Sequence, residues 1–164
     1  MPEAWLTGPV TGIPRELMPA AHMLLQSRAE LANAASSLSA NELWATPGGA
    51  ASVGFHLRHL AGSIDRLLTY ARAEPLSAAQ MSALKEEKTP DPTLDASRAL
   101  HLATSAIDRA LQVYRTVDPT TLLDDRTVGR AQLPSSVIGL LYHIAEHTVR
   151  HTGQIIVTAK VAQT

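Results

Sequence analysis

The sequence has no cysteine, few aromatic residues and almost no excess of charge. One phenylalanine, two tryptophans and three tyrosines stand among 164 residues. Without cysteine, the chain can form neither disulfides nor thiolate metal sites, and it cannot supply a cysteine nucleophile. Its 14 lysines and arginines nearly balance 15 aspartates and glutamates. A dedicated nucleic-acid-binding protein would normally show a basic excess, so we expect no nucleic-acid partner.

Long apolar runs are missing as well. The longest stretch, residues 137–142, is far shorter than the roughly 20 residues that a membrane-spanning helix needs. The N-terminal residues carry an early acidic side chain and lack the apolar centre of a signal peptide. We therefore predict a cytoplasmic protein with no membrane partner. The length predicts a single domain over residues 1–164, large enough to bury a core.

Four segments repeat apolar residues at the three- and four-residue spacing of amphipathic helices. They cover approximately residues 14–37, 52–73, 95–117 and 135–161. Ser52 is a candidate N-cap for the second helix. The third helix is expected to begin at Asp95 or at Thr93, and the fourth at Ser135 or Ser136.

The segments between these helices are rich in proline, glycine and polar residues. Residues 41–51 are expected to form a loop, and residues 74–92 a connection with at most a short helix. Residues 120–134 should be irregular or form a short extended piece. Because no segment convincingly predicts a strand, the expected fold class is all-α, a four-helix bundle. The long middle connections leave room for crossovers in place of the simplest up-and-down order.

Histidine is the residue type that the chain has in plenty, with seven copies. His143, His147 and His151 are spaced four apart on the last predicted helix, so consecutive members lie one turn apart on one face. Two imidazoles at this spacing can bind one metal ion. All three cannot, because the helix rises by about 12 Å from His143 to His151. His151 lies on the predicted inward face and His147 beside it, whereas His143 could be partly exposed.

The second predicted helix contains His56 and His59, three residues apart. Helical periodicity slightly favours His56 on the apolar face and places His59 on its flank. A bundle helix touches two neighbours, however, so a flank position can also face the interior. Spacing alone therefore leaves open whether His56 or His59 joins a metal site. The isolated His22 and His101 are most simply ordinary side chains.

Two motifs together resemble the DinB-like superfamily of metal-dependent four-helix-bundle proteins. The motifs are His59-Leu60-Ala61 followed by Ser63 and Asp65, and His147-x-x-x-His151-x-Gly153-Gln154-Ile155. Residues 5–14 and 128–141 also resemble one branch of this superfamily. The resemblance implies a bundle with long crossover connections, a divalent metal ion on His59, His147 and His151, and a homodimer. The chain departs from the pattern at Gly62, where many members carry an acidic residue.

The resemblance further implies a metal-dependent enzyme that acts on a small-molecule substrate. Thiol-dependent S-transferase chemistry would use a low-molecular-weight thiol bound as thiolate at the metal, and hydrolase chemistry would use metal-bound water. Three neutral imidazoles leave coordination positions for water or substrate, as catalytic sites do. Zinc or nickel is the first expectation for the ion, with iron or manganese as alternatives. The alternative function is a stress-related bundle that binds metal or ligand without catalysis.

Four residues are weak candidates for a catalytic role. Glu146, Asp65 and Tyr70 could act as a general base, and Gln154 could orient a ligand one turn beyond the last histidine. Glu146 also precedes Arg150 by four residues, which is the spacing of an ordinary helix-stabilising ion pair.

Overall fold

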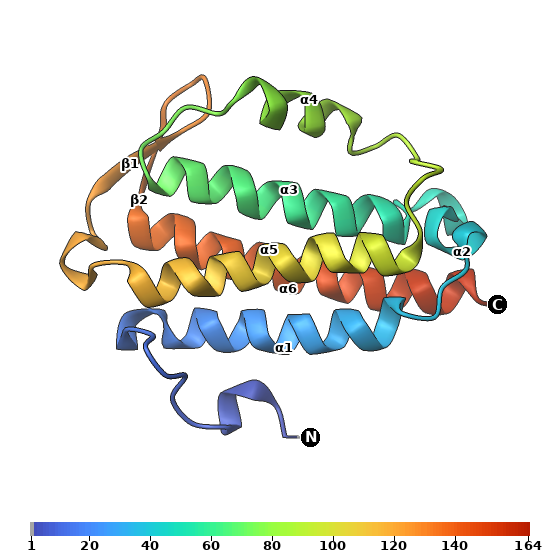
Figure 1. Ribbon diagram of the computed structural model, residues 1–164, viewed down its shortest axis with the longest axis horizontal. Coiled ribbons are helices and arrows are strands. Elements are labelled where there is room, and N and C mark those ends of the chain that lie inside the picture. The colour runs from blue at the N-terminus through green and yellow to red at the C-terminus, as the bar shows by residue number, and fades with distance from the viewer. Residues whose placement is uncertain (1) are drawn as a thin grey trace.

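The computed structural model describes residues 2–164, and four long helices make up most of it (Figure 1). These helices are α1 (Met18–Ala35), α3 (Val53–Ala71), α5 (Ala96–Thr116) and α6 (Val137–Ala162). Each occupies one of the four predicted segments, so the predicted all-α four-helix bundle is confirmed. The connections contain α2 (Ala40–Trp44), α4 (Ala78–Glu86) and the 3-10 helices η1 (Ala4–Leu6), η2 (Arg15–Leu17), η3 (Pro47–Gly49) and η4 (Pro119–Thr121).

The order of the helices in space requires crossovers. α1 packs against α5 and α6, and α3 packs against the same two helices, so the chain crosses the bundle from α1 to α3 and again from α5 to α6. α3 and α5 run in the same direction, opposite to α1 and α6 (Figure 1). Residues 72–95 must therefore return along the whole bundle, and they do so through α4, which packs over α3. The predicted long crossover connections are confirmed.

Side-chain caps determine where three of the long helices begin. Ser52, Asp95 and Ser136 each accept a hydrogen bond from the backbone N–H three residues later, at 3.1, 2.8 and 3.1 Å. Such caps satisfy N–H groups that have no partner inside the helix. The predicted starts at Ser52, Asp95 and Ser136 agree with these caps.

The connection before α3 is more regular than expected. α2 occupies part of the predicted loop at residues 41–51, and that prediction is wrong for residues 41–44. Ser39 accepts from the backbone N–H of Glu42, whose side chain in turn accepts from the backbone N–H of Ser39. This Ser-x-x-Glu capping box is a helix-start signal that the sequence contains. In the connection between α3 and α5, α4 is the short helix that the prediction for residues 74–92 includes.

Residues 120–134 and the two that follow contain a β-hairpin, which corrects the expectation that the chain has no strand. β1 (Asp125–Val128) pairs antiparallel with β2 (Leu133–Ser136). Gly129, with φ of 71°, lies in the turn between them. β2 runs directly into α6, because Ser136 both ends the strand and caps the helix.

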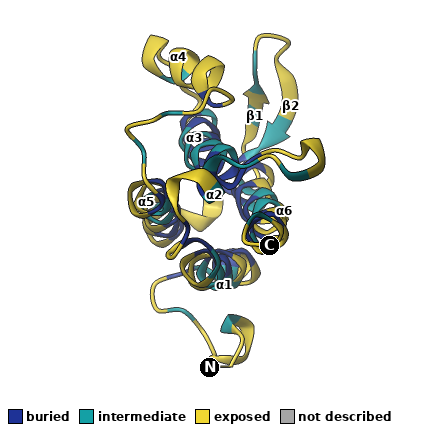
Figure 2. Ribbon diagram, turned by 90° about the vertical axis from the view of Figure 1, so that its right-hand side faces the viewer, coloured by how far each residue is buried: buried dark blue, intermediate teal, exposed yellow. Residues whose placement is uncertain are grey.

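The core lies between the four long helices, and Figure 2 shows buried residues on their inward sides. α4, in contrast, has no buried residue. The large core side chains are mostly aliphatic: Leu17, Leu24, Leu31, Leu57, Leu60, Ile64, Ile107, Leu141, Ile144 and Ile155. Tyr114 is also fully buried, and its hydroxyl donates to the carbonyl oxygen of Leu141 at 2.5 Å. Within residues 2–164, no helix has the length and apolar character needed to span a membrane.

We expect Tyr114→Phe to lower the free energy of unfolding by about 1 kcal/mol, because a buried hydrogen bond is lost. Urea denaturation followed by circular dichroism measures this. Tyr142→Phe is the matched control, since the Tyr142 hydroxyl makes no hydrogen bond within the described residues. The control should change the free energy by less than about 0.5 kcal/mol. Equal losses in the two variants would contradict the prediction.

Candidate metal centre

Three histidines from two facing helices converge in the structure. His59 lies on α3, and His147 and His151 lie one turn apart on α6. Each offers one ring nitrogen to a cluster in which these atoms all lie within 4.8 Å of one another. Nε2 of His59 and Nε2 of His147 are 3.4 Å apart. The structure therefore brings together the three residues that the family resemblance implied.

The packing of α3 against α6 sets this arrangement. Leu60 follows His59 and is fully buried, as are Ile144 and Ile155 on α6. Burying these side chains fixes the rotation of both helices, and the histidines then lie where the two helices face each other. All three imidazoles are only partly buried, so a ligand can approach them.

The spacing of the nitrogens fits a transition-metal ion. Imidazole nitrogens bind zinc at about 2.0–2.1 Å, so two ligands of a tetrahedral ion lie about 3.3 Å apart. The observed 3.4 Å between His59 and His147 is close to this value. The donor set, three imidazoles without a thiolate, suits zinc, nickel, iron or copper. His59 and His147 thus have the separation of two ligands of one ion, and His151 lies close enough to complete a group that could hold a divalent ion.

The environment keeps two of these imidazoles, those of His147 and His151, neutral. Burial, together with the neighbouring His59 and His143, lowers the pKa of His147 to about 4. Burial and the neighbouring imidazoles, first among them His147, lower the pKa of His151 to about 3. Both side chains are therefore neutral at pH 7, which is the form that binds metal.

The second nitrogen of His59 contacts a carboxylate that the sequence did not predict. Glu87 follows α4 directly, and its Oε2 lies 2.8 Å from Nδ1 of His59. Its Oε1 accepts a hydrogen bond from Arg66 of α3 at 2.6 Å. Burial acts to raise the pKa of Glu87, but the hydrogen bonds from His59 and Arg66 hold that pKa below its ordinary value. No spacing along the chain links residue 87 to α3, so the sequence carried no signal for this contact.

The two histidines that the sequence left open occupy different places. His56 is only 6% exposed, and its Nδ1 lies 2.8 Å from Nδ1 of His151, which leaves Nε2 of His151 for a metal. Burial, and then the neighbouring His59, lower the pKa of His56 to about 4. His143 is exposed, and its Nδ1 lies 3.3 Å from a carboxylate oxygen of Glu146. Neither belongs to the three-histidine cluster.

The four catalytic candidates do not join the cluster. Glu146 is exposed and pairs with Arg150, in agreement with the simpler interpretation of that spacing. Asp65 accepts a hydrogen bond from Gln80 at 2.7 Å. Tyr70 and Gln154 line cavities. Within the part of the chain that the structure describes, none of the four hydrogen-bonds to the three histidines.

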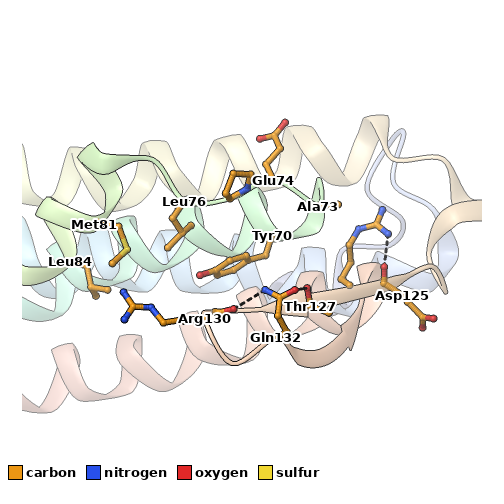
Figure 3. A pocket seen from close by; sticks show the side chains of 13 residues that line it. Tyr70, Ala73, Glu74, Leu76, Met81, Leu84, Asp125, Thr127, Arg130 and Gln132 are labelled. Carbon is orange, nitrogen blue, oxygen red and sulfur yellow. Dashed lines mark hydrogen bonds between the residues drawn. The ribbon is translucent and has the colours of Figure 1, made fainter.

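Two surface cavities lie on either side of the centre. One, of about 600 Å³, is lined by Ala50, Ala51, His56, Arg150, Gly153, Gln154, Val157 and Thr158. Because His56 contacts His151, this cavity adjoins the cluster. The other, of about 720 Å³, lies between α4, the end of α3 and the hairpin, and Figure 3 shows Tyr70 projecting into it. Tyr70 is eleven residues beyond His59, so the two lie on the same side of α3, about 16 Å apart along its axis.

Fold and site together define a four-helix bundle with a three-histidine cluster. Residues 23–155 match the DinB superfamily, and the chain belongs to this superfamily. No curated protein matches the chain. Among solved structures, the chain is similar to YfiT from Bacillus subtilis, described as a probable metal-dependent hydrolase with an unusual four-helix bundle topology. The TM-score is 0.57 at 19% identity, and the alignment covers 90% of each chain, which supports the common fold.

We expect the metal-free protein to lose stability between pH 7 and pH 5. The unfolded chain binds protons at its histidines near pH 6.5, whereas His56 and His147 in the folded protein bind them only near pH 4. In this window the unfolded state binds more protons, so the free energy of unfolding falls as the pH falls. Thermal unfolding in the presence of a chelator measures the effect as a lower Tm at pH 5.

The variant His56→Gln should show a weaker dependence of Tm on pH, since it removes one buried imidazole. His101→Gln removes an exposed histidine of α5 and serves as the matched control. A Tm that stays constant from pH 7 to pH 5 in the wild-type protein would refute the interpretation.

Proposed function

We propose that the protein is a metal-dependent enzyme whose divalent ion is held by His59, His147 and His151. The observation that carries the proposal is the convergence of three imidazole nitrogens, within 4.8 Å of one another, from two rigid helices. No fourth protein ligand joins them among the described residues, and an open coordination position is typical of catalytic sites. Zinc or nickel suits this donor set best, with iron or manganese as alternatives.

We further propose thiol-dependent transferase chemistry as the reaction. An ion in such a site supplies Lewis acidity and lowers the pKa of a coordinated water or thiol. A thiol, with an ordinary pKa of about 8.5, needs a smaller shift to ionise at neutral pH than water does. Because the chain has no cysteine, the thiol must arrive as a low-molecular-weight substrate.

The state of the nearby carboxylates supports a nucleophile of this kind. Glu87 is committed to His59 and Arg66, Asp65 to Gln80, and Glu146 to Arg150. In the described residues, these acids are thus engaged in pairs, and none contacts His147 or His151 as a free general base. A thiol that ionises at the metal does not depend on one.

A small-molecule substrate has room in the cavity that adjoins the cluster. His56 lines this cavity and contacts His151, while Arg150 and Gln154 place polar side chains on its wall. In the proposed function, Gln154 orients the substrate by hydrogen bonds, while Arg150 stays paired with Glu146. Both side chains lie within two turns of the ligands on α6.

Hydrolysis is the second candidate reaction. YfiT, which shares the fold, is described as a probable metal-dependent hydrolase. The same three imidazoles could activate water for attack on an ester or amide. A bundle that binds metal without catalysis is the remaining alternative.

Wild-type protein is expected to bind one equivalent of Zn²⁺ or Ni²⁺, whereas His147→Ala should bind it at least about 100-fold more weakly, because one ligand is lost. Isothermal titration against a competing chelator measures both affinities. His143→Ala is the matched control, since it removes an exposed histidine one turn away on the same helix. Unchanged binding in His147→Ala would exclude the centre.

The zinc-loaded or nickel-loaded enzyme is expected to accelerate transfer of glutathione, bacillithiol or mycothiol to a small electrophile such as monochlorobimane. Fluorescence of the conjugate measures the rate, and His147→Ala should reduce it to the uncatalysed level. Ester and amide hydrolysis by the same preparation would favour the hydrolase. A loaded protein that is silent in both assays would favour the non-catalytic alternative.

A further inference from the structure

We propose that Glu87, supported by Arg66, is a positioning residue that orients His59 for metal binding. This inference rests on the proposed function, because it assigns a role around the same centre. Oε2 of Glu87 accepts the Nδ1 proton of His59 at 2.8 Å, and this contact leaves Nε2 as the nitrogen that faces His147. A carboxylate that accepts from the remote nitrogen of a histidine fixes the ring and raises its basicity as a metal ligand.

The carboxylate of Glu87 is buried, and burying a charged group costs free energy. Glu87 is 4% exposed and Arg66 is 8% exposed. A buried ion pair is often no more stabilising than apolar residues of similar size, so stability alone does not account for it. Here the pair has a third member, since Arg66 holds Oε1 and turns the other oxygen toward His59. Both carboxylate oxygens therefore have a defined partner, and Oε2 is aimed at the centre.

Gly62 makes this approach possible. A Cβ at position 62 would lie 2.5 Å from Oε1 of Glu87 and 2.7 Å from a guanidinium nitrogen of Arg66. Contacts this short force atoms to move, so any larger residue at position 62 would displace the pair. The glycine therefore leaves the space on α3 that the carboxylate from the α4 segment fills.

Glu87 is not needed merely to attach the α4 segment to the bundle. Gln80 of α4 donates to Asp65 at 2.7 Å and to Thr69 at 2.8 Å, both on α3. After α4, Arg58 donates to the backbone carbonyl of Thr89 at 2.6 Å. These bonds hold the segment on either side of Glu87, so the attachment of the segment does not depend on Glu87 alone.

The test compares metal affinity in Glu87→Gln, Gly62→Ala and Glu86→Gln, using Co²⁺ and Zn²⁺ in competition with a chelator. Glu87→Gln removes the charge, and Gly62→Ala displaces the carboxylate without changing a charged group. Both should bind about 10- to 100-fold more weakly than wild type. Glu86→Gln is the matched control, because Glu86 is the exposed neighbour of Glu87 and accepts a hydrogen bond from Ser82. The metal affinity of this variant should equal that of the wild-type protein.

The absorption spectrum of the Co²⁺ protein supplies a readout that a merely structural role would not move. The visible bands should shift in Glu87→Gln and Gly62→Ala, because the His59 ligand changes, and should stay unchanged in Glu86→Gln. Circular dichroism verifies that each variant is folded, and Gly62→Ala carries the test if Glu87→Gln does not fold. Wild-type affinity and spectrum in the folded variants would overturn the positioning role alone. Failure of the wild-type protein to bind Co²⁺ or Zn²⁺ would overturn the proposed function itself.

Discussion

The antiparallel packing of α3 against α6 is the constraint on which the candidate site depends. Both helices bury apolar side chains beside the histidines, and these contacts fix the height and rotation of each helix. A slip of one residue would turn His59 by about 100° away from His147. The ligands therefore need no loop to position them, and the core that stabilises the bundle also pre-organises the centre. This coupling explains how polar side chains can meet at a fixed distance in a small helical protein.

The topology of the bundle explains why the Glu87 carboxylate lies beside the histidines. Because α3 and α5 are parallel neighbours, the chain must return along the length of α3, and α4 forms this return (Figure 1). The return segment passes over the face that carries His59, and Glu87, directly after α4, lies beside that histidine. A connection that the helix order makes necessary thus supplies the buried carboxylate. The same segment also closes one side of the cavity that Tyr70 lines.

The sequence predicts the helices well because their signals are local. Apolar spacing located the four long helices, and Ser52, Asp95 and Ser136, each a predicted candidate start, cap three of them. The Ser39 capping box was visible too, and it shows why a loop assignment based on proline and glycine alone missed α2. The hairpin is harder, since its strands are only four residues each and their register depends on pairing with each other.

The residues of the candidate site show what local sequence patterns do not predict. Periodicity measures burial, and it favoured His56, which is indeed the more buried histidine. Facing a partner is a different property from burial, and only the family resemblance selected His59. Glu87 and its contact with Gly62 depend on a crossover of more than twenty residues, which no periodicity encodes.

The histidine cluster has a cost for the fold. Burying neutral imidazoles beside one another lowers stability in acid, as the low pKa values of His147 and His151 indicate. Aliphatic residues would pack there at no such cost, so the needs of the fold alone do not account for the cluster.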